Sequence, residues 1–166
     1  MKVVTISFIL LLSCFGIVQA KTVDLQTKLL VAHNHWRTLH NAPNLVWDEA
    51  LANYALNYAK KCRFQHSSSG YGENLAEGYK SITAAVDAWY AEEGQYSYRN
   101  PGFSSRTGHF TQLVWKSSQK LGCGYVQCNT HGRSWDYLVC EYSPAGNIVN
   151  SGYFKANVLP AHRLQG

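Results

Sequence analysis

Apolar residues recur at helical spacing in the first part of the chain. The clearest repeat covers residues 51–62, where apolar side chains fall at i, i+3, i+4, i+7, i+8 and i+11 after Asp48, a suitable helix N-cap. Weaker repeats predict helices over residues 24–39, capped by Asp24, and over residues 82–93. The predicted core-facing positions are Leu25, Leu29, Ala32, Trp36, Leu51, Tyr54, Ala55, Tyr58, Ala59, Cys62, Ala85, Ala88 and Trp89.

The pattern changes after Lys120. Residues 121–128 and 135–142 have the composition of β-strands, and the turn-like Asn129–Gly132 separates them. A weaker strand is predicted near Tyr153–Phe154. Helices followed by strands indicate an α+β fold in which helices pack on an antiparallel sheet.

A short apolar segment, Gly108–Ser118, connects the two parts. Phe110, Leu113 and Val114 lie at helical spacing, which predicts a helix with one face in the core. His109 falls in its first turn, an end suited to polar partners. Taken alone, the segment is best interpreted as a buried amphipathic helix that a histidine caps.

The first twenty residues predict export. Lys2 precedes an apolar run that is too short to span a bilayer, and small residues end at Ala20. We expect a secreted, extracellular protein in which residues 1–20 are the signal peptide and residues 21–166 are one domain. A membrane anchor is the rival interpretation, but no stop-transfer segment follows.

The mature chain retains four cysteines, an even number that indicates two disulfides with the pairing left open. Zinc binding by these cysteines is the alternative, although CxxC spacing is absent. The formal charge of +5 falls to +4 without Lys2. Basic residues are scattered, so we expect no nucleic-acid partner, whereas weak attraction to an anionic membrane or a cell-wall surface is compatible with this charge.

Four motifs in order resemble one family. Residues 33–37 (HNHWR) fit an HNxxR helix motif, and residues 72–76 have the sequence GENLA, which we interpret as a loop. Residues 108–118 match a GHFTQLVW signature, and residues 137–148 match a second signature of the same family. The chain resembles the CAP superfamily of cysteine-rich secretory, antigen 5 and pathogenesis-related 1 proteins from about Asp24 to Phe154. This resemblance implies a three-layer α-β-α sandwich with a central antiparallel sheet and an open cleft.

The resemblance also implies the side chains of the cleft. Its two histidines and two acids are His66, Glu73, Glu92 and His109, with Glu93 competing for the place of Glu92. Imidazoles and carboxylates suit a divalent cation such as zinc. The alternative is a hydrogen-bonded cluster that only holds three segments together. The implied disulfides are Cys62–Cys128 and Cys123–Cys140, and we interpret His33, Asn34 and Arg37 as structural.

Three functions are compatible with the motifs. Tyr96, Tyr98 and Phe103 have the spacing of a loop through which fungal relatives bind sterols, although such aromatics can simply pack on the domain. We therefore expect a secreted, non-enzymatic protein that binds a sterol or fatty acid, in defence, virulence or host interaction. The sequence does not indicate an oligomeric state.

The first alternative is a hydrolase that activates a metal-bound water beside Glu73 or Glu92. The absence of HExxH and GxSxG disfavours it, and Ser81, the nearest serine after GENLA, departs from the serine position proposed for relatives, which disfavours a serine nucleophile. The second is a signalling protein that acts through a partner or a released C-terminal peptide. Glu141 stands where related cleavage sites carry asparagine, which disfavours that release.

Overall fold

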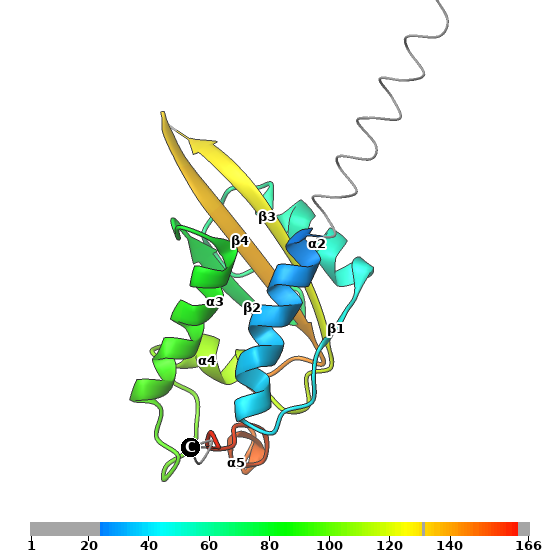
Figure 1. Ribbon diagram of the computed structural model, residues 1–166. Helices are drawn as coiled ribbons and strands as arrows, with labels where there is room; N and C mark the ends of the chain where they lie inside the picture. Colours follow the sequence, from blue (N-terminus) through cyan, green and yellow to red (C-terminus); the bar gives the residue numbers. More distant parts are fainter. Residues whose placement is uncertain (1–23, 131, 163–166) are drawn as a thin grey trace, which may run out of the picture.

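The structure, a computed structural model, describes residues 24–130 and 132–162 (Figure 1). The predicted signal peptide and His131 of the predicted turn lie outside these ranges. None of the helices within them is both long and apolar enough to cross a membrane. Residues 24–39 are helical. The elements that follow are β1 (Val46–Trp47), α2 (Glu49–Ala59), β2 (Gly72–Glu77), α3 (Ile82–Ala91), the 3₁₀ turn Glu92–Gln95, α4 (Gly108–Leu113), β3 (Lys120–Thr130), β4 (Arg133–Ser143) and α5 (Tyr153–Asn157).

The strands form one sheet in the order β1-β3-β4-β2. β3 and β4 are a long antiparallel hairpin, and β2 is antiparallel to β4. The two-residue β1 runs parallel to the start of β3 at the sheet edge. The predicted antiparallel sheet is therefore confirmed, apart from this short edge pair.

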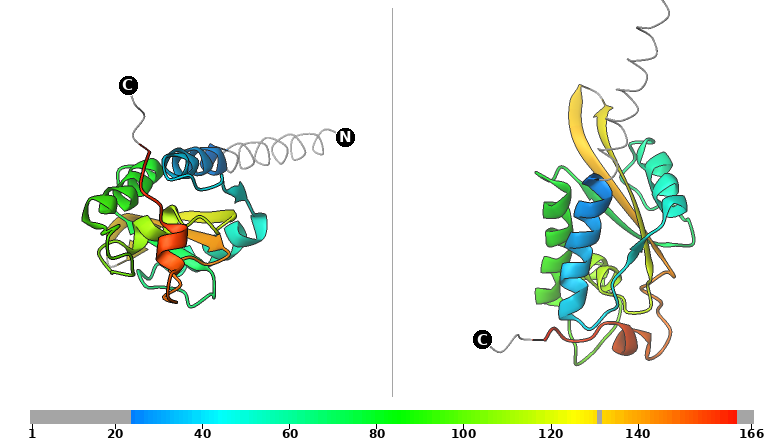
Figure 2. Two further views of the ribbon diagram at one scale, coloured as in Figure 1. Left: turned by 90° about the horizontal axis from the view of Figure 1, so that it is seen from below. Right: turned by 45° about the vertical axis from the view of Figure 1, so that its right-hand side comes forward.

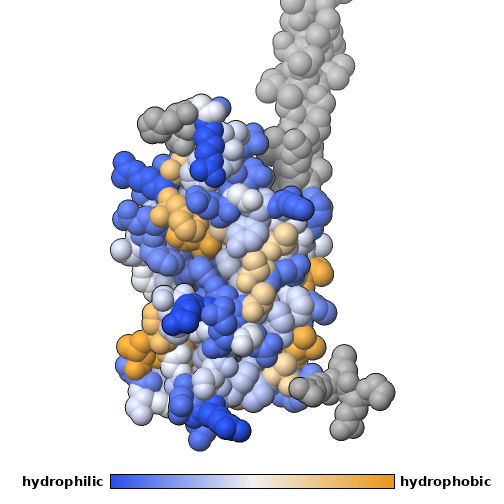
Figure 3. Space-filling view, turned by 90° about the vertical axis from the view of Figure 1, so that its left-hand side faces the viewer, coloured by the Kyte–Doolittle hydropathy of each residue, from blue (hydrophilic) through white to orange (hydrophobic). Residues whose placement is uncertain are grey.

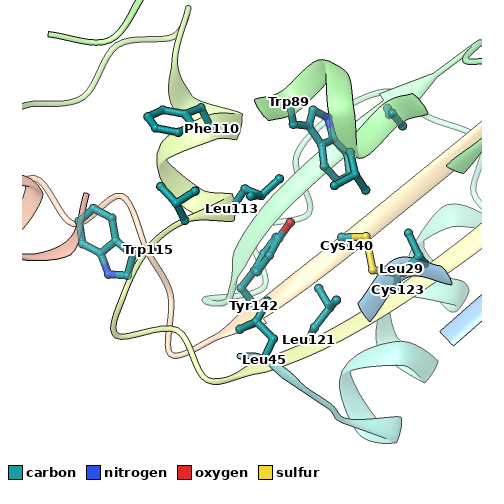
Figure 4. Close-up of a cluster of buried hydrophobic side chains, with 14 of the residues drawn as sticks. Leu29, Leu45, Trp89, Phe110, Leu113, Trp115, Leu121, Cys123, Cys140 and Tyr142 are labelled. Carbon is teal, nitrogen blue, oxygen red and sulfur yellow. A yellow bond between two sulfur atoms is a disulfide. The ribbon is translucent and has the colours of Figure 1, made fainter. Parts of the chain in front are cut away.

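The helices cover both faces of the sheet. Helix 24–39 and α3 lie on one face and α2 lies on the other (Figure 2). Each face has its own cluster of buried side chains. In the larger cluster, Trp89 of α3 and Phe110 and Leu113 of α4 lie above Tyr142 of β4 (Figure 4). The predicted α+β sandwich is thus confirmed.

Helix α2 packs closely against β3 at two glycines of that strand. Asp48 caps it as predicted, because its carboxylate accepts hydrogen bonds from the first amides of the helix. The buried face of α2 consists of Leu51 and three alanines, whose short side chains let the helix approach the strand. Tyr54, which was predicted to face the core, is 37% exposed. A side chain at Gly124 of β3 would place its Cβ 2.2 Å from the backbone nitrogen of Leu56, so only glycine allows this approach.

Both implied disulfides are present. Cys123–Cys140 joins directly opposed residues of β3 and β4, and Cys62–Cys128 ties the end of the α2 segment to β3. The prediction that Cys62 lies within the helix is wrong. The helix ends at Ala59, and Cys62 follows it with a left-handed backbone (φ 50°), which turns the chain toward the next loop.

Two further expectations are corrected. The GENLA segment is the edge strand β2 rather than a loop, because pairing with β4 outweighs the low strand preference of its glycine and asparagine. The predicted strand at Tyr153–Phe154 is the short helix α5. Gly152 before it has a φ of 81°, and the helix turns Phe154 and Asn157 inward while Tyr153 stays exposed.

The HNxxR motif is structural, as interpreted. The fully buried Arg37 side chain donates hydrogen bonds to the carbonyls of Pro43, Leu113, Trp115 and Ser118. Burial lowers the pKa of His33 to about 4, so its neutral ring donates from Nδ1 to Leu29 O and accepts from the Tyr142 hydroxyl at Nε2. The Asn34 side-chain amide exchanges hydrogen bonds with the backbone of Leu45.

The contact between α2 and β3 gives a testable prediction. Gly124→Ala should destabilise the domain by about 3 kcal/mol, because the new Cβ meets helix backbone that cannot move aside. Urea unfolding followed by circular dichroism measures the change. Gly94→Ala is the matched control, since its Cβ would meet no atom within 4 Å. Equal stability of the two variants would contradict the close approach.

Candidate functional site

His66 and Glu73 form the first of two histidine–carboxylate pairs. The Nδ1 atom of His66 lies 2.6 Å from a Glu73 oxygen, and the Ser67 amide donates to the same carboxylate. The Glu73 side chain is 6% exposed, whereas that of His66 is 68% exposed. The hydrogen bond with Glu73 raises the pKa of His66 above its ordinary value. Burial opposes ionisation of Glu73, but hydrogen bonds from His66 and Ser67 lower its pKa overall.

His109 and Glu92 form the second pair. Glu92 lies in the 3₁₀ turn after α3, and one of its oxygens lies 2.6 Å from Nδ1 of His109. Its other oxygen accepts the backbone amides of His109 and Phe110, so Glu92 also caps α4. The competing Glu93 instead accepts the Tyr98 hydroxyl. The structure therefore pairs His109 with Glu92.

The two pairs leave the same atom available on each histidine. A carboxylate that holds Nδ1–H fixes the imidazole tautomer in which the Nε2 lone pair is free to bind a metal or a proton donor. Neither Nε2 has a hydrogen-bond partner among the described residues. Within the same ranges, no three His, Cys, Asp or Glu side chains are grouped so that they could hold a metal ion. Ligation of one cation by all four side chains therefore stays a prediction.

Glu141 is a third acid at this site, and sequence reasoning missed this role. It lies opposite Glu73 in the β2–β4 register and is fully buried. The hydroxyls of Ser67 and Ser69 donate to it. Burial, together with the adjacent Glu73 carboxylate, raises the pKa of Glu141 to about 8. The feature that indicates this role is the position of Glu141 opposite Glu73 of the GENLA segment. That pairing could be predicted only if the GENLA segment was recognised as a strand.

Gln112 joins three of the sequence motifs beside the first pair. Its side chain lies against Gly72 of the GENLA segment and accepts the Gly146 amide of the second signature. A Cβ at Gly72 would lie 2.0 Å from Oε1 of the Gln112 side chain. Asn147 bonds the first turn of α4 through Gly108 and Thr111. The motifs are therefore parts of one packed contact.

Of the three aromatic residues in the predicted lipid-binding loop, two pack on the domain and one is exposed. Tyr96 packs edge-to-face on Phe110, and Tyr98 packs on Tyr96 while its hydroxyl binds Glu93. Both rings therefore lie against the domain. Phe103 is different, because it is 56% exposed and lines a cleft beside His66. Lipid binding through this loop stays a prediction.

Two observations bear on the hydrolase hypothesis. The Ser81 hydroxyl accepts the Ala84 amide as the N-cap of α3 and lies 3.0 Å from the Thr83 hydroxyl. It is thus engaged in capping the helix, and it has no histidine partner among the described hydrogen bonds. A nucleophilic serine needs an adjacent base.

Comparison with known proteins identifies the family. The profile of the cysteine-rich secretory protein family, CAP, matches residues 30–142. This chain is a CAP protein. Protein PRY2 of Saccharomyces cerevisiae is 47% identical over 143 residues, which cover 82% of this chain and 42% of PRY2. A pathogenesis-related protein 1 of Arabidopsis thaliana is 41% identical over 140 residues, covering 81% of this chain and 85% of the plant protein.

The CAP fold is supported by solved structures as well. The crystal structure of NaASP2 with Zn2+ superimposes with a TM-score of 0.65 at 26% identity, covering 83% of this chain and 86% of that one. This CAP chain covers 42% of the Candida albicans relative named secreted protein RBT4, as it does of PRY2, so it spans less than half of these fungal proteins. CAP proteins are in general binding proteins rather than enzymes, and the two disulfides fit an exported chain.

The raised pKa of Glu141 in this CAP domain gives a prediction about pH. Its pKa is about 8 in the folded chain and near 4.5 when unperturbed, so the folded chain binds the extra proton between these values. Stability should therefore fall as pH rises, by on the order of 2 kcal/mol from pH 5 to 8. Glu141→Gln stays neutral and should lose less, as measured by urea unfolding. Exposed Glu77→Gln should follow the wild type, and an unchanged slope in Glu141→Gln would contradict the assignment.

Proposed function

We propose that this CAP domain is a secreted, non-enzymatic protein that carries a sterol or fatty acid in an open cavity at the sheet edge. The observation that carries the proposal is a cavity of about 650 Å³. It lies where the start of helix 24–39, α2, the start of α3 and the edge of β3 meet. Its apolar lining includes Leu25, Trp47, Leu56 and Ile82. This size and lining are typical of small-molecule sites.

The open cavity offers a lipid more apolar contact area than small separate patches on a convex face do. On the face shown in Figure 3, hydrophobic residues form separate small patches among hydrophilic ones. A flexible or planar apolar ligand gains free energy in proportion to the apolar area that it removes from water, about 25 cal/mol per Å². A concave site with apolar side chains in its lining removes more of that area than scattered surface patches.

The cavity and the aromatic loop are separate candidates for lipid contact. The cavity is lined by Ser81–Thr83 at the beginning of α3, whereas Tyr96, Tyr98 and Phe103 follow the other end of that helix (Figure 1). None of the three aromatics lines the cavity. Because two of them pack inward, we assign the principal apolar contact to the cavity and leave Phe103 as the loop's exposed ring.

Filling the cavity tests this function. Ile82→Trp should weaken binding of a fluorescent sterol and of a fluorescent fatty acid by about tenfold or more, because the larger side chain occupies ligand volume. Direct fluorescence titration measures both. Val149→Trp, at a position that is 75% exposed, is the control for added bulk. Loss of binding only in Phe103→Ala would move the site to the loop, and no binding by the wild type would refute the function.

We also propose a divalent cation at the two histidine–carboxylate pairs. NaASP2, which resembles this chain in fold, was crystallised with Zn2+. His66 and His109 would each supply an Nε2 atom, while Glu73 and Glu92 orient the rings. A bound cation would supply Lewis acidity. With two protein donors, most ligands would be water molecules, so we expect weak binding.

Zinc titration by calorimetry tests the cation site. The double variant His66→Ala/His109→Ala should lose the zinc heat that the wild type shows, because both Nε2 donors are removed. Exposed His35→Ala is the control for adventitious binding by a surface histidine. Equal affinity in the wild type and the double variant would remove the proposed site.

We further propose that the protein acts in defence, virulence or host interaction. The support is family resemblance, since a fungal relative is named a secreted protein and a plant relative a pathogenesis-related protein. Signalling through a protein partner or a released C-terminal peptide stays an alternative. Mass spectrometry of secreted material that shows only intact C termini would end the peptide alternative.

A further inference from the structure

A second concave site lies beside the first histidine–carboxylate pair. It is a cleft of about 310 Å³ whose wall is the segment His66–Glu73, closed by Phe103, Gln112 and the Gly146–Asn147 turn. It shares no lining residue with the lipid cavity. Unlike that cavity, it is lined by serine hydroxyls, an imidazole and a carboxylate as well as by aromatic rings. This mixture indicates a different class of ligand.

Two aromatic rings of the cleft are exposed and held in place. Tyr71 is 42% exposed, and its ring meets that of Tyr54 of α2 edge-to-face at 5.8 Å. Phe103 is 56% exposed, and its ring lies over the start of α4, where Gly108 has no side chain to displace it. Pre-organised rings lose little conformational entropy when a ligand stacks on them.

The polar groups of the cleft exclude a wholly apolar ligand. The Nε2 atom of His66 has no protein partner within the described residues, and the Glu73 carboxylate has oxygen lone pairs beyond those that His66 and Ser67 use. A sterol seated here would bury such groups without replacing their bonds to water, at roughly 1–3 kcal/mol for each group. A ligand that fits must offer hydroxyl groups together with an apolar face.

We propose that this cleft binds a neutral hexopyranose residue of an oligosaccharide. A pyranose ring has C–H faces that stack on Tyr71 or Phe103 and hydroxyls that bond with His66 and Glu73. The carboxylate of Glu73, which lines the cleft and whose pKa is lowered by its hydrogen bonds, disfavours anionic sugars. The proposal is independent of lipid binding, because the two sites are lined by different residues.

The test uses the mature chain after EDTA treatment and three probes, laminarihexaose, chitohexaose and mannohexaose, in calorimetric titrations. At least one should bind, and Tyr71→Ala and Phe103→Ala should each weaken its binding about tenfold. Tyr71→Trp should retain binding, because it preserves a stacking surface. Tyr79→Ala is the matched control, since Tyr79 is 41% exposed and lies outside the cleft.

The outcomes separate this site from the lipid cavity. Ile82→Trp should leave oligosaccharide binding unchanged while it weakens lipid binding. If Tyr71→Ala fails to fold, as judged by circular dichroism, Phe103→Ala carries the test from its exposed loop position. The proposal is overturned if none of the three probes binds to the wild type. It is also overturned if Phe103→Ala binds the probes as tightly as the wild type and the Tyr79→Ala control do.

Discussion

The buried guanidinium of Arg37 determines where α4 ends, and the candidate site depends on α4. A charge without access to water is tolerated in a protein interior only when its donors are satisfied. Arg37 meets this condition by binding carbonyls at and after the end of α4, together with one in the loop after its own helix. Two sequence motifs that lie more than seventy residues apart are therefore the two sides of a single contact.

The N-terminal end of α4 is also held by specific hydrogen bonds. A helix of six residues is unstable in isolation, so its position has to come from tertiary contacts. Glu92 binds its first amides and its histidine at once, and Asn74 of β2 binds the His109 carbonyl. The same Asn74 side chain reaches the Tyr142 hydroxyl, which links it to His33. The orientation of His109 is thus a property of the whole sandwich rather than of a loop.

The local sequence pattern predicted the helices and strands whose formation depends on their own residues. It failed for features that depend on which strands pair with each other. Helical spacing and the Asp48 cap predicted α2, and strand composition predicted the β3–β4 hairpin. The register that places Glu141 opposite Glu73 depends on which strands meet, which no local pattern contains. For the same reason the GENLA segment was expected to be a loop. Family resemblance supplied the disulfide pairing and the four cleft residues, but their division into two pairs came from the structure.

The bridge between Cys62 and Cys128 encloses a segment that contains both histidine–carboxylate pairs. If an extracellular protease cuts one peptide bond anywhere within that segment, the two pieces stay covalently joined through sulfur. The sheet and the helices on either side of the cut remain parts of one molecule. A nicked chain therefore keeps its fragments at high local concentration, which favours persistence of the folded domain.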